Sequence, residues 1–176
     1  MPHHQIDFQF LAAPSDVNFG GKVHGGMLMK WMDQAGYACA VGWTGCYCVT
    51  ISVGAIRFRN PVYVGQLVHL HAQVVHTGKT SVQIFISVEA ADPKTMHAIE
   101  TNHCIMTFAA MNDAGELVAV PSWQPQSADD YLLEHYAIQM KGFSCEAERL
   151  LTHRQQPFAI DIFDDNPISN IAMKPS

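Results

Sequence analysis

The sequence predicts an α+β domain in which a curved antiparallel sheet wraps around one long buried helix. Residues 27–41 form a proline-free run of good helix formers that is apolar on nearly every side. Four later segments, rich in valine, isoleucine, threonine and phenylalanine, alternate with a period of two. Because these strands follow the helix instead of alternating with it, the sheet can cover the helix, which indicates an α+β architecture.

The elements of this domain follow in order. Residues 6–12 alternate as a short strand, and a glycine-rich loop then leads to the helix, for which Gly42 and Gly45 are natural stops. In the segment after Lys79, alternate residues from Val82 to Val88 share one face. The four strands are predicted over residues 47–59, 66–77, 80–90 and 98–111, with turn residues between them.

The C-terminal segment differs in composition. Residues 127–130 form an N-cap for a helix to about Lys141, and Gly142 is expected to end it before a second helix over residues 145–155. The side of the first helix that is expected to be apolar carries Tyr131, Leu132, His135 and Ile138.

We therefore divide the chain into a domain of residues 1–124 and a helical C-terminal extension of residues 125–176. Residues 157–176 hold three prolines and few periodic positions, and they form either a tail or an arm on a neighbouring subunit.

Composition excludes several classes of protein. Of the 176 residues, 48% are hydrophobic and 15% charged, which excludes a disordered chain. The net charge of −6 argues against a nucleic-acid partner, and no apolar run is long enough to cross a membrane. The five cysteines form no C-x-x-C pair, which predicts reduced thiols and a cytoplasmic location. His69 and His71 alternate in a strand, and two histidines are an incomplete metal site, so we expect no metal.

The chemistry is predicted at the start of the long helix. Gly25 and Gly26 open it, and the free N–H groups and positive dipole end there suit a carbonyl oxygen that gains charge. The other interpretation of the pair is an ordinary tight turn from loop to helix, which such glycine pairs often form. Asn18 precedes these glycines and either orients a water or acts as a turn residue. His24 is either a donor to the substrate or a helix-start residue without a catalytic role.

Asp33 lies about two turns inside the same helix. A carboxylate on an apolar helix carries a desolvation cost unless it is paired or lines a cavity, and burial would improve it as a general base. Two other interpretations are an ion pair with Lys30 and a position in an oligomer interface.

Three segments together resemble the signature of hot-dog-fold acyl-CoA thioesterases, in the acyl-CoA hydrolase branch. They are Asn18–Gly36, with its Asn, Gly-Gly and Asp positions, then Phe58–Gly65 and Gly78–Ser81, and the resemblance spans residues 6–121. It implies dimers, commonly assembled as trimers of dimers, with active sites at the dimer interface. It also implies an acyl-CoA substrate, and no metal or cofactor besides the CoA of the substrate.

The resemblance assigns Asn18 and Asp33 as catalytic residues from opposite subunits. Asp33 would activate water or form a covalent anhydride, and N–H groups at Gly25 and Gly26 would stabilise the oxyanion. The residues expected to bind substrate are His24, Gly25, Arg57, Lys79, Thr80 and Ser81, and residues 17–88 hold five basic residues but only one acid, Asp33. Two alternatives are a hydratase on the same fold and an acyl-CoA-binding module without catalysis.

Overall fold

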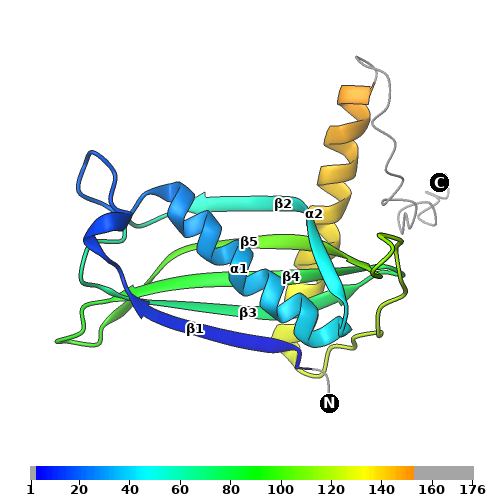
Figure 1. The fold of residues 1–176 in the computed structure, drawn as a ribbon, viewed down its shortest axis with the longest axis horizontal. Helices are drawn as coiled ribbons and strands as arrows, with labels where there is room; N and C mark the ends of the chain where they lie inside the picture. Colours follow the sequence, from blue (N-terminus) through cyan, green and yellow to red (C-terminus); the bar gives the residue numbers. More distant parts are fainter. Residues whose placement is uncertain (1–2, 153–176) are drawn as a thin grey trace, which may run out of the picture.

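The computed structural model describes residues 3–152, in which one antiparallel sheet has a helix on each face (Figure 1). The strands lie in the order β1-β3-β4-β5-β2, so that β1 and β2 are the two edges. This arrangement confirms the predicted α+β architecture with a helical C-terminal extension. The elements are β1 (Gln5–Leu11), the 3-10 helix η1 (Pro14–Asp16), α1 (Gly25–Thr44), β2 (Tyr47–Phe58), β3 (Leu67–Thr77), β4 (Ser81–Ala91), β5 (Ala98–Met111) and α2 (Ala128–Thr152).

The main core lies between α1 and one face of the sheet, here called the inner face. The alternation from Val82 to Val88 is confirmed, because Val82, Ile84, Ile86 and Val88 are all fully buried there. Helix and sheet approach closely at Gly36, where a Cβ atom would lie 2.8 Å from the ring of Phe108. Gly36 therefore sets how near α1 can lie to the sheet.

Only one side of α1 is buried, so the prediction of a helix covered all round is wrong for the single chain. Met29 and Tyr37, on the other side, remain 39% and 40% exposed. The helix ends at Gly45, which adopts the left-handed conformation (φ 69°) and donates its N–H to the carbonyl of Val41 at 2.8 Å. Gly42 lies inside α1, since a glycine weakens a helix by about 1 kcal/mol without ending it.

Helix α2 packs on the opposite, outer face of the sheet. Its predicted cap is confirmed: the Ser127 hydroxyl accepts from the N–H of Asp130, and the Asp130 carboxylate accepts from the N–H of Ser127. The predicted break at Gly142 is wrong, because α2 continues through it to Thr152. Residues 157–176 lie outside the described part.

The apolar side predicted for this helix is also wrong in part. Tyr131 and Leu132 are 62% and 66% exposed, whereas Ala137 is fully buried against Val75 and Ile105 of the sheet. The outer face selects the side that packs, and sequence periodicity alone did not identify it. Within residues 3–152, neither helix has an apolar stretch sufficient to span a bilayer.

Candidate active site

The start of α1 is held by His24, which is the N-cap residue. The Nδ1 atom of its imidazole accepts from the backbone N–H of Gly26 at 3.0 Å. The backbone N–H of His24 donates to the carbonyl of Asp16 at 2.8 Å. A Cβ on Gly25 would lie 3.5 Å from the ring of Phe58, at the end of β2. The local sequence therefore builds a capped helix start with an aromatic ring beside its first residue.

This cap changes what the two glycines offer to a ligand. The N–H of Gly26 is already bound by the His24 imidazole, so it is not open to a carbonyl oxygen in this conformation. Within residues 3–152 the N–H of Gly25 has no acceptor. Of the two N–H groups predicted to bind the oxyanion, that of Gly25 is therefore available. That of Gly26 would become available if the His24 side chain rotated.

Asn18 lies in the loop before α1 and is exposed. Its Oδ1 atom accepts from the N–H of Gly20 at 2.8 Å, while its backbone N–H donates to the carbonyl of Lys22 at 2.7 Å. In the single chain these bonds make Asn18 a turn residue that shapes the loop.

Asp33 lies on the side of α1 that borders the edge strand β2, and it is exposed. The expectation that burial isolates this carboxylate is therefore wrong for the single chain. Its partner is Thr50 on β2, whose hydroxyl donates to Oδ1 of Asp33 at 2.6 Å, and not Lys30. A short bond from a hydroxyl to a carboxylate fixes the side chain in one orientation.

Sequence reasoning missed Thr50. The residue sits in an ordinary strand with valine and isoleucine neighbours, where nothing marks it as functional, and it is 17 positions from Asp33. Only the place where β2 passes α1 brings the two together.

One chain does not bring Asp33 and the start of α1 to the same point. Asp33 follows Gly26 by seven residues, which places it about 10 Å further along the helix axis, given a rise of about 1.5 Å per residue. A base and an oxyanion donor that act on one thioester carbon must both lie within a few ångströms of it. A single copy therefore presents two partial sites.

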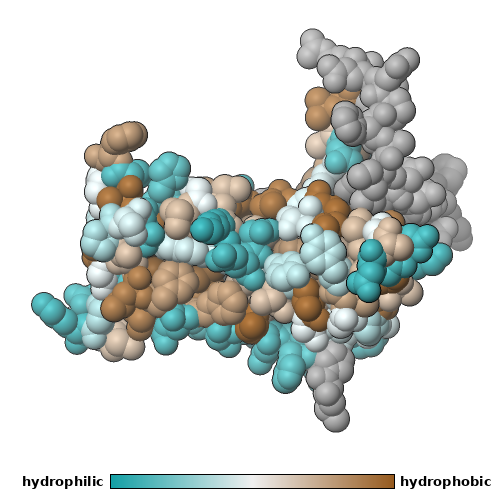
Figure 2. All heavy atoms as spheres, in the orientation of Figure 1, coloured by the Kyte–Doolittle hydropathy of each residue, from teal (hydrophilic) through white to brown (hydrophobic). Residues whose placement is uncertain are grey.

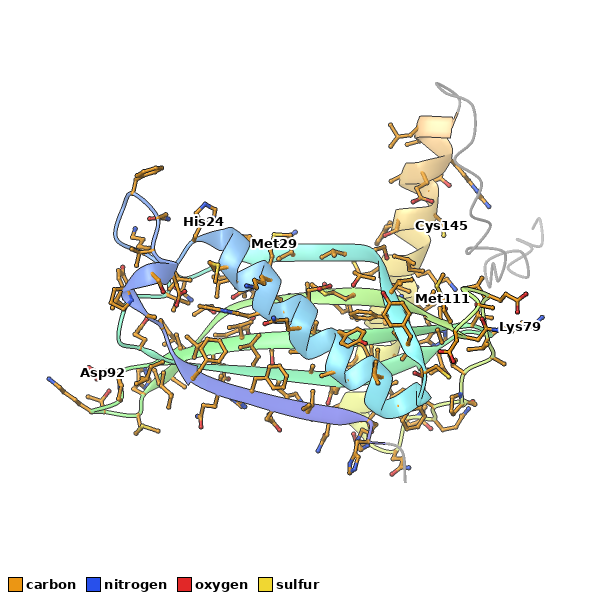
Figure 3. The ribbon with its side chains drawn as sticks, in the orientation of Figure 1. His24, Met29, Lys79, Asp92, Met111 and Cys145 are labelled. Carbon is orange, nitrogen blue, oxygen red and sulfur yellow. The ribbon has the colours of Figure 1, made fainter. Side chains whose placement is uncertain are left out.

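The residues predicted to bind CoA divide between the two ends of the molecule. Figure 3 shows His24 at one end of the sheet and Lys79 at the other. Arg57 directly precedes Phe58 and lies at the end that carries His24. Lys79 and Thr80, in the turn between β3 and β4, lie at the far end, as does Ser81, which is 8% exposed.

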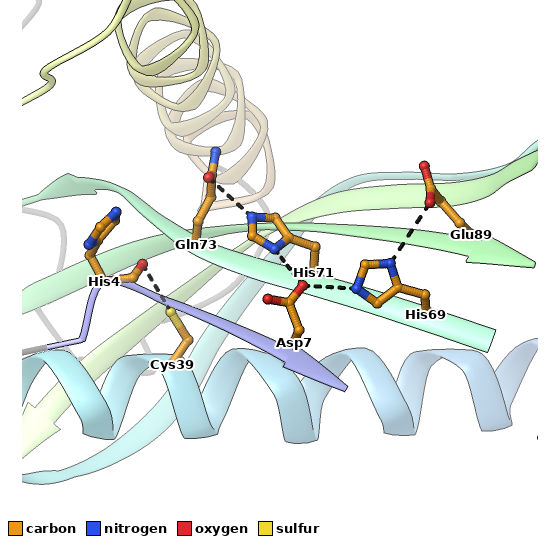
Figure 4. Close-up of polar contacts among 7 residues, drawn as sticks. All are labelled: His4, Asp7, Cys39, His69, His71, Gln73 and Glu89. Carbon is orange, nitrogen blue, oxygen red and sulfur yellow. Dashed lines mark hydrogen bonds and ion pairs between the residues drawn. The ribbon is translucent and has the colours of Figure 1, made fainter. Parts of the chain in front are cut away.

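The two histidines of β3 belong to a polar cluster on the outer face (Figure 4). His69 and His71 lie 2.8 Å and 2.9 Å from the same carboxylate oxygen of Asp7, on the neighbouring strand β1. The bond from His71 is the main cause that lowers the pKa of Asp7. Within residues 3–152 no group of three or more histidine, cysteine or acidic side chains is arranged to hold a metal ion.

The five cysteines are free thiols, as predicted. Burial raises the pKa of Cys39 and of Cys104 to about 12 and also raises that of Cys48. A thiol with so high a pKa stays protonated at neutral pH and is a poor nucleophile.

The class of this protein follows from its architecture. A five-stranded antiparallel sheet in the order β1-β3-β4-β5-β2, with one long helix across its inner face, is the hot-dog fold. The family model of the Thioesterase superfamily matches residues 20–97, which include the start of α1, Asp33 and Thr50. Together with a thioesterase that is 32% identical, and of which this chain covers 94%, the match shows that the chain belongs to this superfamily.

Three known proteins illustrate the relationship. An uncharacterized acyl-CoA thioester hydrolase of Haemophilus influenzae is 29% identical over 126 residues, which cover 69% of this chain and 81% of its own. The hexameric thioesterase y2039 of Yersinia pestis is 32% identical, with a TM-score of 0.62 over 66% of this chain and 94% of its own. An acyl-CoA hydrolase of Staphylococcus aureus, in complex with butyryl-CoA and CoA, has a TM-score of 0.78 at 22% identity and shares the fold over 88% of this chain and 96% of its own.

Proposed function

We propose that this thioester hydrolase cleaves acyl-CoA at sites shared between two copies of the chain. The observation that carries the proposal is the Asp33 carboxylate, which Thr50 holds at 2.6 Å on the side of α1 that the sheet leaves uncovered. A carboxylate that is held in one orientation is suited to take a proton from water. Membership of the thioesterase superfamily supplies the reaction type.

Two copies are proposed because one chain keeps its functional groups apart. If α1 of one copy lies antiparallel to α1 of another, the Asp33 of each faces the helix start at Gly25 of the other. The side of α1 left free by the sheet, with Met29 and Tyr37, is the surface that such packing would bury. The hexameric state of the Yersinia pestis protein supports assembly, and we propose a dimer that further assembles as a trimer of dimers.

Residue spacing gives further support. Three structures of alanine variants of the Staphylococcus aureus hydrolase replace an asparagine, an aspartate and a threonine that are 15 and then 17 positions apart. Asn18, Asp33 and Thr50 have the same two spacings in this chain. Those three positions were chosen for substitution in a protein of the same fold, and the match favours the same set here.

The proposed reaction needs no strong acid. Asp33 takes a proton as water attacks the thioester carbon, and the oxygen that gains charge accepts from the N–H of Gly25, joined by that of Gly26 once His24 rotates. Asn18 from the other copy orients the water or the carbonyl. The CoA thiolate then leaves readily and is protonated. A covalent anhydride on Asp33, hydrolysed by water in a second step, is the alternative route.

The CoA phosphates are proposed to lie between copies. Arg57 is at the end of the molecule that carries the helix start, whereas Lys79, Thr80 and Ser81 are at the other end. An extended ligand bound across two antiparallel copies would meet both sets, one from each chain. We propose that no metal or further cofactor takes part, and a cytoplasmic location is consistent with the five free thiols.

The test replaces Asp33 with asparagine, which keeps the size of the side chain and removes its basicity. Release of free thiol from acyl-CoA substrates of two to sixteen carbons should fall about 100-fold or more in kcat, while binding of free CoA persists. Asp113→Asn, in an exposed turn, is the matched control and should retain the parental rate. A parental rate in Asp33→Asn would refute the assignment.

A hydratase and a binding module are separated from this function by one substrate. Crotonyl-CoA carries both a thioester and a double bond, so a thioesterase releases thiol, a hydratase removes the enoyl absorbance without thiol release, and a binding module does neither. Thiol release from this substrate is the expected result.

A further inference from the structure

The helix α2 has two halves with different surroundings. In its first half Ala137 is fully buried, and Leu133, Tyr136 and Met140 pack with it on the outer face of the sheet. The helix crosses the edge strand β2 at Gly54, where a Cβ atom would lie 3.9 Å from the end of Met140. A small residue at the crossing lets α2 pass close to the sheet.

The second half of α2 extends beyond the sheet. Figure 1 shows the helix continuing past β2, and Figure 3 places Cys145 on this projecting part. All residues from 146 to 151 are exposed, although the helix remains regular to Thr152. An exposed helix end is expected to be polar unless another surface covers it.

The projecting half is instead apolar along one side. Phe143, Leu150 and Leu151 are 65%, 71% and 68% exposed, and Ala147 lies between them. Figure 2 shows hydrophobic side chains on this end of the helix. We call residues 143, 147, 150 and 151 the distal stripe.

The distal stripe continues the side of α2 that packs on the sheet. At 3.6 residues per turn, positions 140, 143, 147 and 151 follow one line along the helix. Because Met140 faces the sheet, the distal stripe faces the space into which the sheet would extend beyond β2. Whatever covers the stripe must therefore lie next to the β2 edge.

The β2 edge is itself incomplete. It is a twelve-residue strand at the end of the sheet order, so one row of its backbone groups has no neighbouring strand among the described residues. Its side chains include Tyr47, Val53 and Phe58, which are 57%, 41% and 51% exposed. Long apolar edges of this kind recruit another strand.

We infer that the distal stripe packs on the outer sheet face of a second copy of this chain that continues the sheet beyond β2. A two-fold contact makes the exchange mutual, so each copy gives one helix end and receives one. The second half of α2 then acts as a clamp across the seam between the two copies. This inference rests on the dimer proposed above, to which it adds a contact of the C-terminal helix, and it does not depend on the chemistry of Asp33.

The first test measures assembly of the full chain. The double variant Phe143→Ser with Leu150→Ser should dissociate at about tenfold higher protein concentration or more than the parent, as judged by light scattering after size exclusion. Leu132→Ser is the matched control, because Leu132 is also exposed (66%) but lies in the first half of α2, away from β2. Unchanged circular dichroism would confirm that the variants fold.

The second test identifies the surface that covers the stripe. A photoreactive p-benzoylphenylalanine in place of Leu151 should form a cross-link to the β2 or β5 region of another copy, identified by mass spectrometry of the doubled band. A cross-link to residues 153–176 of the same chain, or none, would overturn the inference, as would a double variant that assembles like the parent. Thiol release by the Leu132→Ser control is measured in parallel. It tests the proposed function separately, because the cross-link and the assembly measurements report only on the contact of α2.

Discussion

The hydrogen bond between Thr50 and Asp33 offers the most direct test of how the site is built. Thr50→Val keeps the shape of the side chain but removes the hydroxyl that donates to the Asp33 carboxylate at 2.6 Å. A hydrogen bond to a charged group contributes about 1.5–3 kcal/mol to the free energy that holds the two groups together. Both residues are exposed in the single chain, so we take the lower value, and about 1.4 kcal/mol corresponds to tenfold in rate. We therefore expect kcat to fall about tenfold.

The assay is continuous release of free thiol from an acyl-CoA, with kcat and KM measured separately. Because Thr50 acts through Asp33 and not on CoA, the loss should appear in kcat with KM nearly unchanged. Thr50→Ser restores the donor and should recover most of the rate. If Thr50→Val is as fast as the parent, or if Thr50→Ser is as slow as Thr50→Val, the proposal that Thr50 orients the carboxylate is refuted.

Three further predictions concern stability and reactivity. Gly36→Ala should lower the free energy of unfolding by about 1 kcal/mol in denaturant titration, because the added methyl clashes with the sheet, whereas Gly42→Ala, with nothing nearer than 3.7 Å, should raise it. Asp7→Asn should lower the urea midpoint at pH 7 and have less effect as the pH falls below 3.8, since a lowered pKa in the folded state stabilises only while the carboxylate is charged. Cys39 and Cys104 should resist thiol reagents at pH 8 until the protein unfolds, because burial raises their pKa to about 12; modification in the folded protein would contradict this.

Strand periodicity predicted the sheet within about a residue at most strand ends, since alternate residues of the strands face the core under α1. The strand after Lys79 is the clearest case, because Val82, Ile84, Ile86 and Val88 are all fully buried. The ends of the helices were less predictable. Both Gly42 and Gly142 lie inside helices, because tertiary packing outweighs the modest cost of a glycine. Only Gly45, with its positive φ, ends one.

The candidate site was predictable in identity but not in geometry. Asn18, Asp33 and the two glycines could be selected from their spacing and from the chemistry of a carboxylate on an apolar helix. The bond from Thr50 to Asp33, and the use of the Gly26 N–H by His24, depend on how β2 and the loop fold against α1. No local pattern in the sequence encodes such contacts.

The burial of α1 explains why Asp33 attracts attention in the sequence yet lies exposed in the structure. The helix is apolar on nearly all sides, but the sheet of one chain covers only the side that carries Met32 and Gly36. The uncovered side holds Met29 and Tyr37 together with Asp33. Apolar residues on that side are accounted for if a second copy covers them, and the same contact would desolvate Asp33 and bring a second helix start within its reach. The desolvation argument made from the sequence then applies to the assembled protein, in which the carboxylate would gain both its low-dielectric surroundings and its substrate.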